Sequence, residues 1–304
     1  MGKIAFLFAG QGAQAVGMSR DICEQSPAAR RVRDLADEET LRVWLGGTAE
    51  ELTRTINTQP CVFLAELACA EALTEAGVAP QAVAGFSLGE LAAAAYAGIL
   101  PYDRAFALTQ ERARLMQRCA EENPGAMLAA LRIAPDALAE AVAAVPDAWR
   151  VNFNSPEQTV VAARETSVAA LEREIAARGG KTVRLAVGGA FHSPLMAAAT
   201  RGLAAYLADE PINEPRIPVY TNLTAEPYAD IRAELAAQAS SPVLWQKTIE
   251  NMRRDGFDTF IEVGPGRVLS GLVQKIDKSL KTASVRDAAT LEQTIKQINE
   301  QIAE

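Results

Sequence analysis

The sequence predicts an α/β fold in which a largely parallel sheet is interrupted by a smaller, inserted subdomain. Outside the middle of the 304-residue chain, short apolar strands alternate with helices, as in parallel sheets covered by helices. Between residues 126 and 186 the order changes to βαββαβ, which is typical of a ferredoxin-like unit. We therefore expect one chain to build two packed units.

The first part of the chain carries two apolar strands, each followed by glycine. Residues 4–8 form an apolar run that enters a Gly-Gln-Gly turn, as a buried strand does. A second strand at 82–84 leads through Gly85 into a strongly helix-forming run. The helices expected here end at glycine or at an Asn-Pro-Gly break and span residues 59–76, 88–98 and 102–121.

The middle of the chain alternates strands and helices differently. Strand, helix, strand, strand, helix and strand are expected in turn at residues 126–133, 135–145, 149–154, 159–163, 167–178 and 182–186. We expect this ferredoxin-like subdomain to occupy residues 125–190. The segments 1–124 and 191–304 then form one α/β core around it.

The last part returns to the α/β pattern. A helix at 193–208 precedes a strand at 217–221. A helix at 242–255 precedes a strand at 257–263, which enters a Gly-Pro-Gly turn before a final helix that runs through Leu272. This alternation favours a mostly parallel sheet in the core.

Charge and composition exclude several classes of function. The formal net charge of −8 argues against a general nucleic-acid binder, which needs basic surface to meet phosphates. The apolar run at 4–9 is too short for a signal segment or a membrane span, so we expect a cytoplasmic protein without a membrane partner. In such a chain the glycosylation acceptor Asn222-Leu-Thr224 is read as chance. With one histidine and no CxxC pair, no metal site is expected.

A serine between strand and helix is the first candidate for chemistry. Residues 85–89 read G-F-S-L-G and fit the G-x-S-x-G motif. A nucleophile elbow needs this context, because the sharp turn exposes the hydroxyl of Ser87 and leaves the next amide to face an oxyanion. The alternative is a serine in a plain turn or at a helix N-cap.

A serine nucleophile needs a base, and the chain offers a single histidine. His192 follows a glycine-rich stretch at the expected subdomain boundary, although a lone histidine is usually structural or exposed. The order Ser87 before His192 resembles that of α/β-hydrolases, which place an acid between the two. The glycine-rich turn at 10–14 is either an ordinary βα turn or a second source of oxyanion-hole amides.

Together, eight segments in order resemble the malonyl-CoA:acyl carrier protein transacylase family. They span nearly the whole chain and are GQGAQ (10–14), TQP (58–60), GFSLGE (85–90), RARLMQ (112–117), NFNSP (152–156), GAFHSPLM (189–196), SPVLW (241–245) and EVGPG (262–266). The resemblance implies a hydrolase-like catalytic core with a ferredoxin-like subdomain. One departure is Phe86, where many relatives carry His; this leaves His192 without a rival.

The resemblance also assigns roles to the candidate residues. It implies Ser87 as the acylated residue and His192 as its general base. The backbone amides of Gln11 and Leu88 would form the oxyanion hole. The main-chain carbonyl of Gln238 would orient the histidine in place of a carboxylate, which explains the missing acid.

Two further residues are implied to select the acyl group. Helical periodicity does not distinguish Arg112 from its neighbour Arg114. The resemblance selects Arg112 as the partner of the malonyl carboxylate, which a guanidinium binds bidentately. Phe191 matches the family's malonyl-type signature, and its ring would crowd a 2-methyl branch.

The implied activity is that of an [acyl-carrier-protein] S-malonyltransferase in fatty acid biosynthesis. Malonyl-CoA would donate its acyl group to Ser87, and the phosphopantetheine thiol of acyl carrier protein would accept it, in a ping-pong reaction without a cofactor. Alternatives are a trans-acting acyltransferase of a polyketide synthase, a partner of malonate decarboxylase, a thioesterase or esterase using the same Ser-His pair, and a carrier-docking module without activity.

Overall fold

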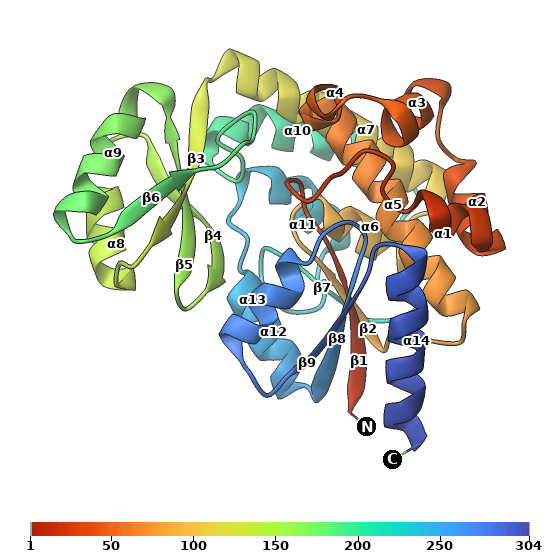
Figure 1. Ribbon diagram of the computed structural model, residues 1–304. Coiled ribbons are helices and arrows are strands. Elements are labelled where there is room, and N and C mark those ends of the chain that lie inside the picture. Colours follow the sequence, from red (N-terminus) through yellow and green to blue (C-terminus); the bar gives the residue numbers. More distant parts are fainter. Residues whose placement is uncertain (1, 304) are drawn as a thin grey trace.

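The computed structural model describes residues 2–303, with side chains up to residue 300, and contains two separate sheets (Figure 1). The larger sheet has five strands in the order β7-β2-β1-β8-β9, and all neighbouring pairs are parallel. Its strands are β1 (Lys3–Phe8), β2 (Ala82–Gly85), β7 (Val219–Tyr220), β8 (Phe257–Val263) and β9 (Lys281–Val285). The predicted α/β class with a mostly parallel sheet is confirmed.

Side chains of β1 alternate between two cores, one on each face of the sheet. Phe6 and Phe8 pack with helices α5 (Thr55–Glu75) and α6 (Gly89–Tyr96). Ala5 and Leu7 point to the opposite face, where α12 (Trp245–Arg254) and α13 (Val268–Ile276) cover them. A strand that is buried on both faces reads as a continuous apolar run, which is the signal seen at residues 4–8.

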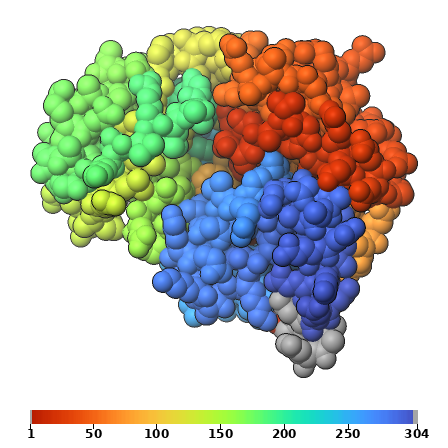
Figure 2. Space-filling view, viewed as in Figure 1, coloured from red at the N-terminus to blue at the C-terminus, as the bar shows by residue number. Residues whose placement is uncertain are grey.

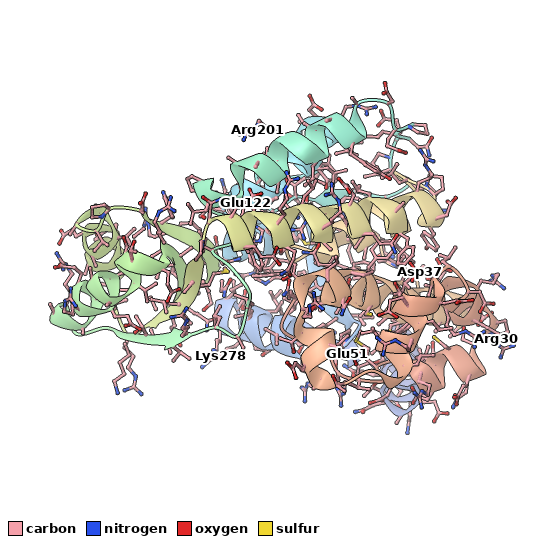
Figure 3. All side chains as sticks on the ribbon, turned by 90° about the horizontal axis from the view of Figure 1, so that it is seen from above. Arg30, Asp37, Glu51, Glu122, Arg201 and Lys278 are labelled. Carbon is pink, nitrogen blue, oxygen red and sulfur yellow. The ribbon has the colours of Figure 1, made fainter. Side chains whose placement is uncertain are left out.

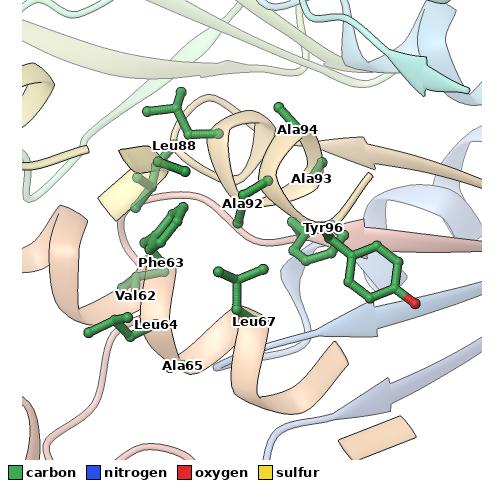
Figure 4. Packing of buried hydrophobic residues seen from close by; sticks show 14 of the residues in the cluster. Val62, Phe63, Leu64, Ala65, Leu67, Leu88, Ala92, Ala93, Ala94 and Tyr96 are labelled. Atoms are coloured by element: carbon green, nitrogen blue, oxygen red, sulfur yellow. The ribbon is translucent and has the colours of Figure 1, made fainter. Parts of the chain in front are cut away.

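Small side chains bring α6 close to α5. In Figure 4 the alanines Ala92 and Ala93 of α6 lie among larger apolar side chains of α5, such as Leu67. The ring of Tyr96 at the end of α6 is 5.8 Å from the rings of both Phe6 and Phe8. This packing fixes the helix that follows the predicted nucleophile.

The other helices of the core surround these elements. They are α1 (Arg20–Gln25), α2 (Pro27–Arg33), α3 (Glu38–Gly46), α4 (Ala49–Thr53), α7 (Tyr102–Glu122), α10 (Ala197–Leu207), α11 (Ile231–Ala237) and α14 (Ala288–Ala303). Figure 3 shows α7 running beside α10, with Glu122 at the end of α7 that leads into the subdomain. Among the described residues, no helix is both long enough and apolar enough to cross a bilayer.

The second sheet is antiparallel and lies in the middle of the sequence. Its strands β3 (Gly125–Leu131), β4 (Ala148–Ser155), β5 (Gln158–Arg164) and β6 (Lys181–Arg184) have the order β4-β5-β3-β6. Helices α8 (Pro135–Ala143) and α9 (Glu165–Ala177) complete the βαββαβ unit and pack on one face with their own apolar cluster. The ferredoxin-like subdomain is therefore confirmed, whereas its exact limits, 125–190, stay a prediction.

Several elements differ from the sequence-based expectation. Helix α5 begins at Thr55, four residues before the predicted start at 59, and contains Pro60. The helix expected at 193–208 begins instead with a 3-10 turn, Pro194–Met196, which Ser193 caps by accepting from the amide of Leu195; helix α10 starts after it, at Ala197. The short helices α1–α4 and α11, the longer C-terminal helix α14 and the edge strand β9 were not predicted, since their apolar patterns are short or half exposed.

The two glycines of the G-x-S-x-G motif are required by close backbone contact. A Cβ on Gly89 would overlap the carbonyl oxygens of Phe8 and Ala9, and one on Gly85 would overlap the backbone of the first helical turn. We expect Gly89→Ala to lower the free energy of unfolding by about 3 kcal/mol, as overpacking of rigid neighbours does. Urea denaturation monitored by circular dichroism measures this.

Gly271 provides the matched control for that substitution. It lies inside α13, is exposed and would place a Cβ in open space. Gly271→Ala should therefore raise the free energy of unfolding by about 0.5–1 kcal/mol, because alanine loses less backbone entropy in a helix. Equal effects of the two substitutions would contradict the packing described for the elbow.

Candidate active site

The candidate site lies where the carboxyl ends of the central strands meet. Strands β1, β2 and β8 are adjacent, so the loops that follow them share one edge of the sheet. A cavity of about 420 Å³ lies between this edge and the subdomain. It is lined by Gly12 of the first loop, Ser87 of the second, Val268 of α13 and Val160 of β5. In Figure 2 the green subdomain meets the red N-terminal and blue C-terminal surfaces.

Ser87 lies in a sharp turn between β2 and α6. Its φ of 55° falls in the left-handed region, which side chains other than glycine, asparagine and aspartate rarely adopt. Such strained backbone is typical of functional residues held by their surroundings. The residue is half-buried and faces the cavity, as the elbow motif predicted.

The single histidine lies next to this serine. His192 is 3% exposed, and its Nε2 is 2.7 Å from Ser87 Oγ. Its Nδ1 is 3.1 Å from each of two main-chain oxygens, those of Gln238 and Ser241. Carbonyl oxygens only accept hydrogen bonds, so Nδ1 carries the proton and Nε2 accepts the hydroxyl of Ser87. The structure thus brings together Ser87, His192 and the carbonyl of Gln238, which lie far apart in the sequence and were predicted to act together.

Burial and a nearby cation keep this imidazole neutral. Loss of hydration, and then the positive charge of Arg112, lower the pKa of His192 from 6.5 to about 4. The carbonyls of Gln238 and Ser241 act in the opposite direction but do not outweigh burial. At neutral pH the ring is therefore in the form that can accept a proton.

The guanidinium of Arg112 is buried beside the same serine. The residue is 1% exposed, and α7 places it against α5 and the turn that carries Gln238. Its Nη1 donates to Gln59 Oε1 at 2.8 Å, while Nη2 donates to Gln238 Oε1 at 2.7 Å and to Ser87 Oγ at 3.2 Å. Its Nε has no partner among the described residues.

The charge of Arg112 survives burial. Loss of hydration lowers the pKa of Arg112 to about 10, and the buried carboxyl of Glu90 opposes this shift. The group is therefore cationic at neutral pH, although its contacts are neutral amides and a hydroxyl. A buried cation with neutral partners and a spare donor is suited to bind an anion.

The two predicted oxyanion amides belong to residues that line the cavity, on two different loops. Gln11 follows β1, and its side chain donates to Thr55 Oγ1 at 3.2 Å. Leu88 is the N-cap residue of α6. Within residues 2–303, neither backbone amide donates a hydrogen bond to another group of the protein. Both donors are thus not used by the described part of the chain.

The two aromatic positions that were noted in the sequence both line the cavity. Phe191 is buried and lines the cavity beside His192. Phe86 also lines the cavity, and its ring packs edge-on against Trp245 at 5.4 Å between centroids. Phenylalanine at 86 therefore adds an apolar wall and no further titratable group.

The structure adds residues that sequence reasoning missed. Gln59 holds Arg112, and the TQP segment was the signal for it. Asn152 and Asn154 line the cavity, and the buried side-chain oxygen of each lacks a hydrogen-bond partner among the described residues. Glu90 is buried, and this raises its pKa to about 7 despite hydrogen bonds from neighbouring groups. Across residues 2–303, no group of three or more potential metal ligands occurs.

Comparisons with known proteins find relatives that match almost the whole chain. The chain matches the family described as acyl transferase domain over residues 5–302. It is 38% identical to the malonyl CoA-acyl carrier protein transacylase of Bacillus subtilis, with 99% of each chain covered. The malonyl CoA-acyl carrier protein transacylase of Clostridium perfringens superposes with a TM-score of 0.95 at 31% identity, over 99% of this chain and 98% of that one.

A solved complex is also similar to the chain. It contains a malonyl-transacylase bound to its type II polyketide synthase acyl-carrier protein in the holo form. That transacylase superposes with a TM-score of 0.92 at 32% identity, over 97% of this chain and 99% of the other. The likeness extends over both the core and the subdomain, since nearly all of both chains is covered.

The single histidine makes its ionisation directly measurable. With ¹⁵N-labelled histidine, NMR should show a neutral ring protonated at Nδ1 from pH 5.5 to 8, because the pKa of His192 is lowered to about 4. Arg112→Gln should move the titration to higher pH, since it removes the charge that adds to the lowering. An imidazolium at pH 6 in the wild type would contradict the described environment.

The lowered pKa of His192 also makes the stability of the fold depend on pH. The unfolded chain binds a proton at His192 near the ordinary pKa of 6.5, whereas the folded chain binds it only near 4. The contribution of His192 to stability is therefore complete above about 6.5 and is lost as the pH falls toward 4.

Proposed function

The chain belongs to the malonyl-CoA:acyl carrier protein transacylase family, and we propose that it transfers malonyl groups from malonyl-CoA to the phosphopantetheine thiol of an acyl carrier protein. One observation carries this proposal. A serine with a neutral histidine at 2.7 Å shares a cavity with the buried cation of Arg112. The first two supply acyl transfer chemistry, and the third supplies a site for the free carboxylate of malonate.

In the first half-reaction, Ser87 Oγ attacks the thioester carbon of malonyl-CoA. Its proton passes to Nε2 of His192, while Nδ1–H remains bonded to the carbonyls of Gln238 and Ser241. The carbonyl oxygen becomes an oxyanion and accepts from the amides of Gln11 and Leu88. Loss of one such donor typically costs about 10²–10³ in rate. The C–S bond then breaks, and the coenzyme A thiolate takes the proton from His192.

The second half-reaction reverses these steps with a different thiol. The phosphopantetheine thiol of the carrier gives its proton to His192 and attacks the carbonyl carbon of the malonyl ester. The same two amides accept the second oxyanion. Collapse breaks the bond to Ser87 Oγ, which recovers its proton from His192. No group beyond the two substrates is required, so the reaction is proposed to proceed without a cofactor.

Arg112 and Phe191 are proposed to select the acyl group. The guanidinium is fixed by Gln59 and Gln238 and keeps an unpartnered Nε, which supports binding of a carboxylate. An acyl group without that charge leaves the buried cation without an anion, which is costly. The ring of Phe191 lines the cavity, and we propose that it crowds a 2-methyl branch.

The alternatives use the same serine and histidine. A thioesterase or esterase has no use for a buried guanidinium beside Ser87 Oγ, so Arg112 favours the transferase. A docking module without activity would not need a strained serine at 2.7 Å from a neutral base. A polyketide carrier is the partner of one similar transacylase. We propose the carrier of fatty acid biosynthesis for this chain, with a cytoplasmic location and neither nucleic acid nor membrane as partner.

Mixing the protein with malonyl-CoA should produce a covalent malonyl adduct on Ser87. Intact-mass spectrometry should detect the adduct within the mixing time and show its loss when a holo carrier protein is added. Ser87→Ala should form none, because no hydroxyl remains to accept the acyl group. A wild-type protein that stays unmodified, or that releases only free malonate, would rule out the transferase.

Replacing the buried cation should change acyl preference. We expect Arg112→Ala to lower kcat/KM for malonyl-CoA by about 10²–10⁴-fold, because charged hydrogen bonds to the carboxylate are lost. The rate with acetyl-CoA should fall much less. Arg114→Ala is the matched control, since Arg114 pairs with Glu111 on the surface of the same helix. A parallel loss with both acyl donors would argue against carboxylate recognition by Arg112.

The carrier is identified by comparing acceptors. Holo carrier proteins of fatty acid and polyketide systems from the same cell, assayed at equal concentration, should differ in kcat/KM. The fatty acid carrier is expected to be the better substrate. A higher kcat/KM with a polyketide carrier would assign the enzyme to polyketide synthesis, and the proposed transfer reaction would stay the same.

A further inference from the structure

Asn222 is a buried polar residue that the proposed chemistry does not use. It follows β7, is 1% exposed and lies directly beneath the turn that carries the nucleophile. Its side-chain Oδ1 accepts from the backbone amide of Ser87 at 2.6 Å, and its Nδ2 donates to the carbonyl of Gly85 at 2.5 Å. One side chain therefore bridges both sides of the elbow.

The orientation of this amide is determined by its partners. A backbone N–H only donates and a carbonyl only accepts, so Oδ1 must face Ser87 and Nδ2 must face Gly85. The backbone of Asn222 is held in turn, because its amide donates to Glu90 Oε2 at 2.8 Å and its carbonyl accepts from Leu244 at 2.9 Å. Asn222 is thus a fixed support, and its burial leaves no surface for glycosylation.

The elbow needs such a support because its conformation is unfavourable. Ser87 has a φ of 55°, and a relaxation toward negative φ would swing Oγ away from Nε2 of His192. The following amide, that of Leu88, would turn with it. The two hydrogen bonds of Asn222 join the residues on either side of Phe86 and oppose this relaxation.

We propose that Asn222 is the positioning residue of the nucleophile, whose side-chain amide closes the elbow and keeps Ser87 Oγ on His192 Nε2. This inference rests on the proposed function only in taking Ser87 as the nucleophile. Among the described residues no hydrogen bond joins Asn222 to Arg112, whose side chain is held by Gln59 and Gln238. Its loss should therefore affect the chemical step more than malonyl recognition.

Asn222→Ala tests the inference through a split between kinetic constants. We expect kcat for malonyl transfer to fall about 10²-fold, since small misplacement of a reacting group has effects of that size. The KM for malonyl-CoA should change by less than about threefold, because binding groups stay in place. A fall in kcat/KM that comes entirely from KM would overturn the proposal.

Asn251→Ala is the matched control for loss of a buried asparagine. Asn251 Nδ2 donates to the carbonyl of Ala225 at 2.8 Å and to Glu226 Oε1 at 3.0 Å, in the turn that follows Asn222. None of its side-chain hydrogen bonds within the described part of the chain reaches the elbow, so Asn251→Ala should lower the melting temperature without changing kcat. If kcat fell equally in the two variants at equal folded fraction, Asn222 would have only a structural role and the proposal would be wrong.

Asn222→Asp adds a signature that loss of stability cannot imitate. An ionised carboxylate accepts from Ser87 but repels the carbonyl of Gly85, whereas a protonated one donates to it and restores both hydrogen bonds. Burial raises the pKa of the new aspartic acid. Two nearby carboxyls raise it further: Glu90 accepts from the backbone amide of residue 222, and Glu234 accepts from the hydroxyl of the neighbouring Thr221. Activity of Asn222→Asp relative to wild type should therefore recover as the pH falls from 8 to 5.5. A pH-independent ratio would overturn the proposal.

A probe without a carboxylate separates this inference from the proposed function. An uncharged fluorophosphonate reacts with activated Ser87 by forming an O–P bond, releasing fluoride and passing the serine proton to His192. Labelling followed by intact mass should be about 10²-fold slower in Asn222→Ala than in wild type, with circular dichroism unchanged. This result holds even if malonyl-CoA proves not to be the donor. Equal labelling rates in the two folded proteins would show that Asn222 does not position Ser87.

Discussion

The buried charge of Arg112 is the constraint on which the arrangement of the site depends. A cation taken out of water costs several kcal/mol unless the surroundings compensate it. Here the hydrogen-bond acceptors are the neutral amides of Gln59 and Gln238 and the hydroxyl of Ser87. The carboxyl that opposes the lowering of the pKa of Arg112 is that of Glu90, which accepts from Gln238 Nε2 at 3.1 Å. Gln238 consequently serves twice, since its main-chain oxygen holds the imidazole and its side chain holds the guanidinium.

Beneath these groups lies a second layer that fixes the nucleophile. Glu90 accepts from the amide of Asn222, the hydroxyl of Tyr228 and the side chain of Gln238. Asn222 closes the elbow, and Gln238 Nε2 donates to the carbonyl of Ser87 at 2.6 Å. The strained serine is thus bonded on both of its backbone polar groups. The buried carboxyl of Glu90 therefore supports both Asn222, which holds the elbow, and Gln238, which holds the guanidinium. The position of the nucleophile and the position of the cation depend on the same hydrogen-bond network.

Sequence reasoning reached the parts of this site that carry a local signal. Strand β8 begins and ends at the predicted residues. The elbow motif and the single histidine made Ser87 and His192 the candidates, and the resemblance assigned their roles; the structure places them 2.7 Å apart. Arg112 was distinguished from Arg114 only by resemblance, because both lie on one helix and only packing buries the first. Asn222 was read as a chance glycosylation signal, since its contact with Ser87 spans 135 positions and leaves no periodic trace. Long-range polar contacts of this kind are the part that pattern alone does not reveal.

The electrostatics of the site link recognition to basicity. Arg112 is the second-largest cause, after burial, of the lowered pKa of His192. An anion on the guanidinium offsets that charge, so a bound malonyl carboxylate would remove part of the lowering of the pKa of His192, while burial, the larger cause, would remain. The imidazole would then be a stronger base when the proper acyl group is present than with an uncharged one. Selectivity for malonate would in this way arise in the proton-transfer step as well as in binding, from a single buried cation placed between the two.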